Sequence, residues 1–408
     1  MNMKIRLIIM NFLQFAVWGA WLISLGSYLA ITLGLEGVQI GSFFATMGIA
    51  SLFMPAIMGI IADRWIPAQK LLGICHFIAA AFIVAAASQT EYASLYTLML
   101  LSVMFYMPTI ALSNSVAYNA LDKAALDPVK AFPPIRVWGT VGFICSMLSV
   151  DMLKFGLNPN QLYLSAALGV ILGFYSFTLP NCEISKESSA GGFVEKLGLK
   201  AFSLFKERRM AIFFIFSMTL GMSLQITNAF ADSYIKSFGD TAVHGSKYLG
   251  TFGVEYSTTL ISLSQISETL CILLIPFFLR RFGIKKVMLI SMVAWVFRFA
   301  LLGAGNPGAG VWMFILSMIV YGVAFDFFNI SGSLFVEQET SPEIRSSAQG
   351  VFMIMTNGFG AFIGSYVAGY VVDMFGWPIS WYIFAGFAAV VAVLFAVIFK
   401  YKHTPASA

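Results

Sequence analysis

Long apolar runs follow one another along almost the whole sequence, and they constrain the chain to a membrane protein. Hydrophobic residues make up 59% of the 408 residues and charged residues 11%, whereas soluble domains have about 25% charged residues. A helix that spans a bilayer needs about 20 predominantly apolar residues. We therefore predict an all-α integral membrane protein with about twelve transmembrane helices. They are expected at residues 6–32, 38–62, 70–88, 93–117, 135–153, 160–180, 210–236, 257–279, 285–304, 310–332, 345–371 and 378–400.

Basic residues occupy alternate loops of this predicted pattern. Of the 24 Lys and Arg residues, all but Lys154, Lys236, Lys247 and Arg298 fall on one side, and Arg298 lies inside the ninth span. Loops rich in Lys and Arg mark the cytoplasmic side of a membrane protein, so both termini are expected in the cytoplasm. We attribute the net charge of +5 to this topology and not to nucleic-acid binding.

The longest polar interval lies midway along the chain and divides it. We predict an N-terminal six-helix bundle at 1–180, a cytoplasmic linker at 181–209 and a C-terminal six-helix bundle at 210–408. The linker forms either an ordinary loop or a helix that lies on the membrane surface. The apolar face of that helix would comprise Phe193, Leu197, Leu199, Phe202 and Leu204.

Two similar loops support a two-bundle fold. Gly59-Ile60-Ile61-Ala62-Asp63-Arg64 follows the second span, and Arg280-Arg281-Phe282-Gly283-Ile284-Lys285-Lys286 follows the eighth. Both resemble degenerate copies of a loop motif of the major facilitator superfamily. That resemblance implies a major-facilitator-type fold, in which two six-helix bundles expose a site near the bilayer midplane alternately to each side.

Two carboxylates lie inside apolar runs. Asp326 belongs to the tenth span and Glu268 to the eighth. A charged side chain at the centre of a membrane helix costs roughly 2.5–3.5 kcal/mol on insertion scales, so acids at such positions are functional candidates. The alternative is an acid that only holds helices together through a buried hydrogen-bond network.

Other polar residues line the same helix faces at spacings of three and four. Arg136, Thr140 and Phe143 share a face of the fifth span, and an arginine reaching lipid headgroups is the alternative for Arg136. Gln225 and Asn228 share a face of the seventh span, where amides either bind hydroxyls or join two helices.

The eighth and tenth spans carry further candidates. Gln265 lies three residues before Glu268, and Tyr321 and Phe325 share a face that Asp326 borders. Aromatic rings stack on planar rings such as nucleobases, and amides hydrogen-bond to hydroxyls. Together, these polar and aromatic helix faces suit a small, flat, uncharged ligand with a polyhydroxyl part.

Several of these segments resemble one transporter family closely. The segments are Phe132–Thr140, Phe213–Asn228, Ser264–Thr269 and Tyr321–Ser331. They are similar to the bacterial nucleoside:proton symporters of the major facilitator superfamily, and the resemblance covers nearly the whole chain. It implies import of nucleosides across the inner membrane, driven by protons. The nucleoside-binding positions that it implies are Arg136, Thr140, Phe143, Gln225, Asn228, Gln265, Glu268, Tyr321, Phe325 and Asp326.

We therefore predict a proton-coupled nucleoside symporter of the inner membrane. Asp326 is expected to carry the coupling proton, and Glu268 to share or tune it. Nucleosides, protons and membrane lipid are the expected partners, with no cofactor, metal, nucleic acid or obligate protein partner. The alternative is a major-facilitator transporter of another small polar solute such as a sugar. An enzyme is not expected, because we find neither a nucleophile–base pair nor a cluster of metal ligands.

Overall fold

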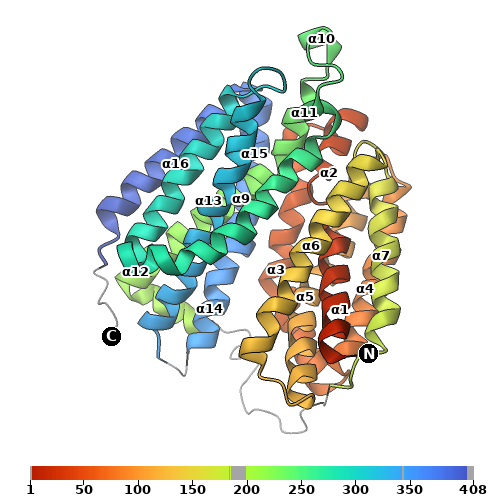
Figure 1. Ribbon diagram of the computed structural model, residues 1–408, viewed down its shortest axis with the longest axis vertical. Coiled ribbons are helices and arrows are strands. Elements are labelled where there is room, and N and C mark those ends of the chain that lie inside the picture. Colours follow the sequence, from red (N-terminus) through yellow and green to blue (C-terminus); the bar gives the residue numbers. More distant parts are fainter. Residues whose placement is uncertain (1, 183, 185–198, 342–343, 402–408) are drawn as a thin grey trace. The chain divides into compact units, whose positions relative to one another are not determined.

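Helices dominate the structure. The computed structural model describes residues 2–182, 184, 199–341 and 344–401, and these residues contain helices and connecting turns but no β-strand (Figure 1). Nine helices in the described part of the chain are long and apolar enough to cross a membrane. The predicted all-α membrane fold is confirmed.

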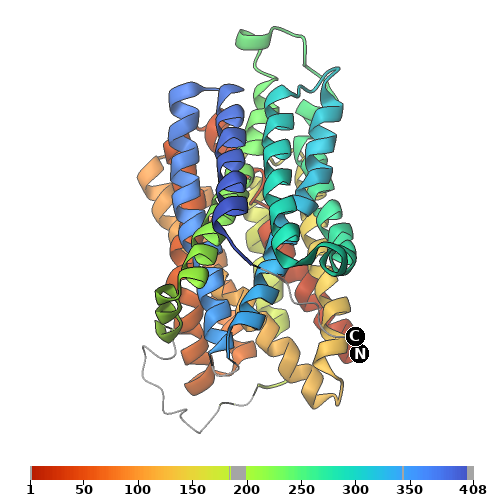
Figure 2. The same ribbon diagram turned by 90° about the vertical axis from the view of Figure 1, so that its left-hand side faces the viewer.

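Local features explain why nine such helices correspond to about twelve predicted spans. α1 (Met3–Gly19) and α7 (Asn160–Ser176) are shorter, at 17 residues each. α12 (Ser257–Ala304) contains two predicted spans that meet at Gly283, where φ is 73°. Positive φ is readily adopted only by glycine, so this residue lets the chain turn between the spans. Figures 1 and 2 show the two segments of α12 running in different directions.

The N-terminal half of the chain contains five further helices and one π-helical turn. α1 ends earlier than the predicted first span, and short elements continue that span. The elements after α1 and before α7 are α2 (Leu25–Ser27), η1 (Tyr28–Thr32), α3 (Gly37–Arg64), α4 (Ala68–Ala87), α5 (Tyr92–Lys123) and α6 (Pro128–Met152).

The C-terminal half is built in the same way. Its predicted eleventh span is interrupted by a π-helical segment, η3. The elements other than α12 are η2 (Leu199–Lys206), α9 (Arg208–Ser237), α10 (Thr241–His244), α11 (Phe252–Glu255), α13 (Val311–Glu339), α14 (Arg345–Met353), η3 (Ile354–Gly360), α15 (Ala361–Phe375) and α16 (Ile379–Ile398). Of the proposed linker helix, η2 is described, and Phe193 and Leu197 lie outside the described residues.

Residue contacts divide the chain into two compact units. Unit 1 comprises residues 1–35 and 46–197, and unit 2 comprises 36–45 and 198–408. The first turns of α3 therefore pack with the C-terminal half, although the predicted boundary at 180 assigns them to the N-terminal bundle. The Asp373 carboxylate of α15 accepts hydrogen bonds from the backbone N–H groups of Gly37 (2.6 Å) and Val38 (2.8 Å). The predicted bundle limits themselves stay a prediction.

In unit 1, α1 and α6 approach each other closely because glycines face the partner backbone. A Cβ atom on Gly142 would lie 2.8 Å from the Phe12 carbonyl carbon, and one on Gly19 would lie 2.8 Å from the Phe143 Cα atom. Small residues permit such close helix packing inside membranes. The contact places the α6 face that carries Phe143 against α1.

In unit 2, a cluster of aromatic side chains joins three helical segments. The Phe213 ring of α9 lies 6.2 Å from Phe328 and 4.7 Å from Phe335 of α13, and 5.5 Å from Phe352 of α14. These centroid separations lie within the range of favourable aromatic pairs. Dispersion contacts of this kind stabilise helix association in lipid, where the hydrophobic effect does not act between helices.

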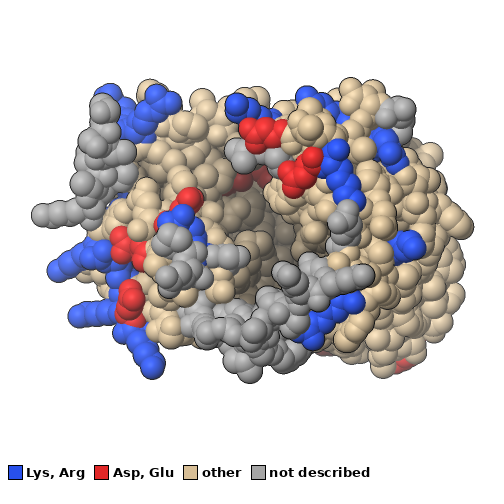
Figure 3. Space-filling model, turned by 90° about the horizontal axis from the view of Figure 1, so that it is seen from below, with Lys and Arg blue, Asp and Glu red and all other residues tan. Residues whose placement is uncertain are grey.

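Charged side chains are prominent on the face seen in Figure 3. Figure 3 views the structure from below and shows Lys and Arg side chains around this face, with fewer Asp and Glu side chains. A membrane protein needs such a charged surface only where its helices leave the apolar layer.

Replacing Gly142 by Ala should destabilise unit 1. The added methyl group meets the Phe12 backbone, and overpacking of this kind typically costs about 1–3 kcal/mol. Thermal unfolding in detergent measures the effect. Gly386→Ala in α16 is the matched control, because nothing lies within 4 Å of its added Cβ. Equal melting temperatures for the two variants would contradict the close packing of α1 and α6.

Candidate functional site

In unit 1, two of the three predicted α6 residues, Arg136 and Phe143, contact α1. The Arg136 guanidinium lies over the Phe15 ring, 3.8 Å from the centroid. Phe143 is buried and meets the Trp18 ring edge to face, with centroids 6.2 Å apart. Thr140 is half-buried on the same helix. Arg136 thus makes a cation–π contact within the unit, a kind of contact that is strengthened when it is desolvated.

Trp18 is a further candidate binding residue, which is not among the ten residues predicted from the sequence. Its indole Nε1–H is buried and has no hydrogen-bond partner among the described residues. A buried, unpaired donor is costly, and it is available to a ligand that supplies an acceptor. The sequence signal was one of two tryptophans, Trp18 and Trp21, in the first apolar run, and tryptophan there is usually a packing residue.

The two predicted amides of α9, Gln225 and Asn228, have different surroundings from Asp232, the acid that follows them on the same face. Gln225 is buried, and its Oε1 atom has no hydrogen-bond partner within the described chain. Asn228 is half-buried. Asp232, one turn further on, forms an ion pair with Lys236 (3.0 Å) and accepts hydrogen bonds from the hydroxyls of Ser257 (2.5 Å) and Thr258 (3.0 Å). Asp232 is therefore a structural link between α9 and α12.

The predicted α12 and α13 residues come together because α13 packs tightly on α12. A Cβ on Gly322 would lie 2.5 Å from the Ser267 carbonyl oxygen, and the Ser267 hydroxyl donates a hydrogen bond to the Ile319 carbonyl. Any larger residue than glycine at position 322 would separate the helices.

This packing aligns the functional candidates of the two helices. The side chains of Tyr321 and Gln265 are neighbours, and the carboxyl groups of Glu268 and Asp326 are close enough to interact electrostatically. Phe325 stacks on Tyr321, with centroids 6.0 Å apart and an interplanar angle of 14°. Five of the ten predicted residues therefore form one cluster in unit 2.

Asp326 has an unused hydrogen-bonding atom. Its side chain is 3% exposed, and Oδ2 has no partner among the described residues. An acid that serves only to join helices would be expected to have both oxygens bonded. The unbonded oxygen therefore favours a functional role for Asp326 over a purely helix-joining one.

Arg298, in the second segment of α12, is a buried cation behind Tyr321. Its side chain is 1% exposed, its Nη1 atom donates to the Ser317 carbonyl (2.7 Å), and its guanidinium carbon lies 4.5 Å from the Tyr321 ring centroid. No carboxylate in the described chain lies within ion-pair distance of it. The sequence signal was a charged residue in the interior of the ninth span, away from the basic residues at its start.

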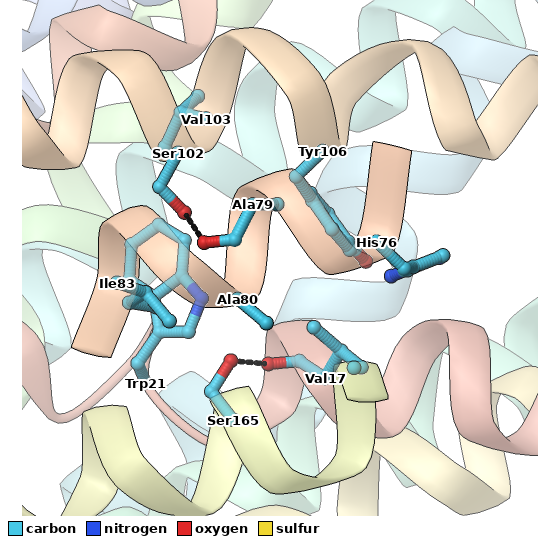
Figure 4. A pocket seen from close by; sticks show the side chains of 11 residues that line it. Val17, Trp21, His76, Ala79, Ala80, Ile83, Ser102, Val103, Tyr106 and Ser165 are labelled. Carbon is cyan, nitrogen blue, oxygen red and sulfur yellow. Dashed lines mark hydrogen bonds between the residues drawn. The ribbon is translucent and has the colours of Figure 1, made fainter. Parts of the chain in front are cut away.

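A small cavity in unit 1 is distinct from these clusters. It is lined by His76, Tyr106, Ser102 and Ser165 among others (Figure 4), and its volume is about 10 Å³. That volume suits about one water molecule, whereas small-molecule sites measure about 300–1,000 Å³. His76 Nε2 is 2.9 Å from Gln14 Oε1, which agrees with a packed polar histidine. The described residues contain no cluster of three or more metal ligands.

Comparison with known proteins identifies close relatives. The sequence matches the profile of the family described as nucleoside H+ symporter over residues 1–404. It is 49% identical to the nucleoside permease NupG of Escherichia coli K12, across 99% of this chain and 97% of the relative. It is 48% identical to the xanthosine permease of the same organism, across 99% and 98% of the two chains.

Solved structures of one of these relatives have the same fold. A crystal structure of the nucleoside transporter NupG superposes with a TM-score of 0.91 at 49% identity, covering 98% of this chain and all of the other. An aspartate-to-alanine variant of that transporter gives a TM-score of 0.94 at 48% identity, with the same coverage.

Replacing Asp232 by Ala should destabilise unit 2 strongly. The change leaves the Lys236 ammonium group, whose side chain is 8% exposed, without its partner. Breaking a buried ion pair in this way costs about 3–5 kcal/mol. Arg209→Ala is the control, because the Arg209–Glu339 pair is more exposed and such pairs contribute about 0–1 kcal/mol. Unfolding measurements in detergent compare the two, and equal losses would argue against a structural role for Asp232.

Proposed function

The chain belongs to the nucleoside H+ symporter family, and from this premise we propose that it imports nucleosides together with protons by alternating access. The observation that carries this proposal is the cluster of Gln265, Glu268, Tyr321, Phe325 and Asp326 in unit 2. It combines planar rings, an amide and two interacting acids. Family membership supports nucleosides over the sugar alternative.

Aromatic rings and amide groups bind different parts of the nucleoside in this proposal. Phe143, Tyr321 and Phe325 offer faces on which a base stacks. Gln225, Asn228 and Gln265 offer donors and acceptors to ribose hydroxyls or base edges. Arg136 and Thr140 add donors from unit 1. The unpaired Gln225 Oε1 supports this assignment, because a ligand hydroxyl would satisfy it.

Proton coupling rests on the two acids. Asp326 carries the proton, and Glu268 shares or tunes it. When protonated, Asp326 can be enclosed with substrate without burial of a charge, and loss of the proton favours reopening and release. One proton moving through 100 mV supplies about 2.3 kcal/mol. At about 1.36 kcal/mol per decade, this supports a nucleoside gradient of about fiftyfold.

We place the protein in the inner membrane of a bacterium with both termini in the cytoplasm. Support comes from the distribution of Lys and Arg over alternate loops and from the bacterial origin of the relatives. Basic loops are retained on the cytoplasmic side during insertion.

Asp326→Asn should abolish proton-driven accumulation of labelled uridine or adenosine in proteoliposomes. The amide is neutral and cannot exchange a proton, so nucleoside exchange without a proton gradient should persist. Asp240→Asn is the matched control, because Asp240 is exposed and caps α10 through Ala242 N–H, a role that asparagine also fills. Undiminished accumulation by the Asp326 variant would remove this residue from the coupling step.

Nucleosides, but not sugars, should stabilise the purified protein. Binding to the folded state by a ligand at 100 times its Kd adds about 2.7 kcal/mol. A thermal-shift panel of uridine, adenosine, sucrose and maltose tests this. A shift with the sugars and none with nucleosides would favour the sugar alternative.

Arg298→Met should weaken nucleoside binding about tenfold, because Tyr321 loses a desolvated cation–π contact that is worth about 1–2 kcal/mol. Isothermal titration calorimetry on protein of verified melting temperature measures the Kd. Lys247→Met is the control, since Lys247 lies 4.9 Å from the Tyr248 ring and is outside the proposed site. An unchanged Kd for the Arg298 variant would show that nucleoside binding does not require the contact between Arg298 and Tyr321.

A further inference from the structure

The first segment of α12 carries a groove on its outer surface. Leu273, Pro276, Phe277, Arg280 and Arg281 line it, and its volume is about 470 Å³. Residues spaced by three and four lie on one face of a helix, so these five form a continuous stripe. Leu273 is 74% exposed and Phe277 61% exposed. The groove therefore has an apolar floor and a cationic end.

The two arginines at that end have no ion-pair partner among the described residues. No Asp or Glu occurs between Glu268 and Asp326, whereas this interval contains Arg280, Arg281 and three other basic residues. Neither Arg280 nor Arg281 forms an ion pair with a carboxylate of the described chain. The contact recorded for Arg281 is a long one, 5.9 Å from the Phe282 ring centroid. Both arginines are exposed, so their guanidinium groups are available to an external anion.

The position of the two arginines suits a lipid phosphate. They close the apolar segment of α12, and Gly283 turns the chain immediately after them. Arginine at the end of a membrane helix lies at the level of the headgroups. Its planar guanidinium group forms paired hydrogen bonds with phosphate oxygens.

We propose that this groove is a binding site for an anionic phospholipid. An acyl chain lies along Leu273, Pro276 and Phe277, and the phosphate accepts hydrogen bonds from Arg280 and Arg281. A free phosphate ion would match the arginines but would leave the two most exposed apolar side chains uncovered, so the structure favours the lipid. None of the five residues belongs to the nucleoside-binding set, and the proposal does not rest on the transport function.

The test is native mass spectrometry of the full chain titrated with phosphatidylglycerol or with phosphatidylcholine of the same acyl chains. Arg280→Gln/Arg281→Gln should weaken binding of the first phosphatidylglycerol about thirtyfold, from about 1 kcal/mol for each basic residue near an anionic lipid. Phosphatidylcholine binding should not change. Lys206→Gln/Arg208→Gln is the matched control, because it removes two exposed cations of the same unit and should leave the tightest lipid bound.

Three further measurements distinguish lipid binding from phosphate binding and from a folding defect. Phe277→Ser should weaken phosphatidylglycerol binding, and added inorganic phosphate should not displace the lipid. Arg280→Lys/Arg281→Lys keeps both charges and replaces the glutamine variant if that variant fails to fold; it should bind phosphatidylglycerol more weakly than the unaltered protein. Equal losses in the groove and control variants would overturn the proposal. So would unchanged binding in both arginine variants, or displacement of the lipid by phosphate alone.

Discussion

The free-energy cost of a charge in an apolar interior governs the buried polar groups of unit 2. A charged side chain removed from water needs an opposite charge, a set of dipoles, or the ability to change its protonation state. Asp232 and Lys236 use the first solution. Arg298 uses the second, through a backbone carbonyl and an aromatic face. Asp326, with a free Oδ2 atom beside a second acid, is suited to the third.

The surroundings of a buried acid distinguish a structural acid, Asp232, from a functional candidate, Asp326. Asp232 and Asp326 are both buried aspartates in membrane helices, and composition alone does not distinguish them. Their surroundings do, because three partners bond to Asp232 whereas one oxygen of Asp326 stays unbonded.

Much of the fold and part of the site could be predicted from sequence. Apolar run length identified the helices, and the helical period placed Gln265 next to Glu268 in space, since both depend only on local chain geometry. Contacts between helices could not be predicted in the same way. The approach at Gly322, the cation behind Tyr321 and the packing of the first turns of α3 with unit 2 all depend on residues distant in sequence.

The α3 helix has a mechanical consequence for a protein of two units. Its first turn is held by the Asp373 carboxylate in unit 2, whereas Met54, Met58 and Ala62 further along belong to the apolar core of unit 1. A hydrogen-bonded helix is a stiff rod that bends only gently unless its ladder is interrupted. Any displacement of one unit against the other must therefore either flex this rod, with Pro55 its weakest point, or detach its end from Asp373.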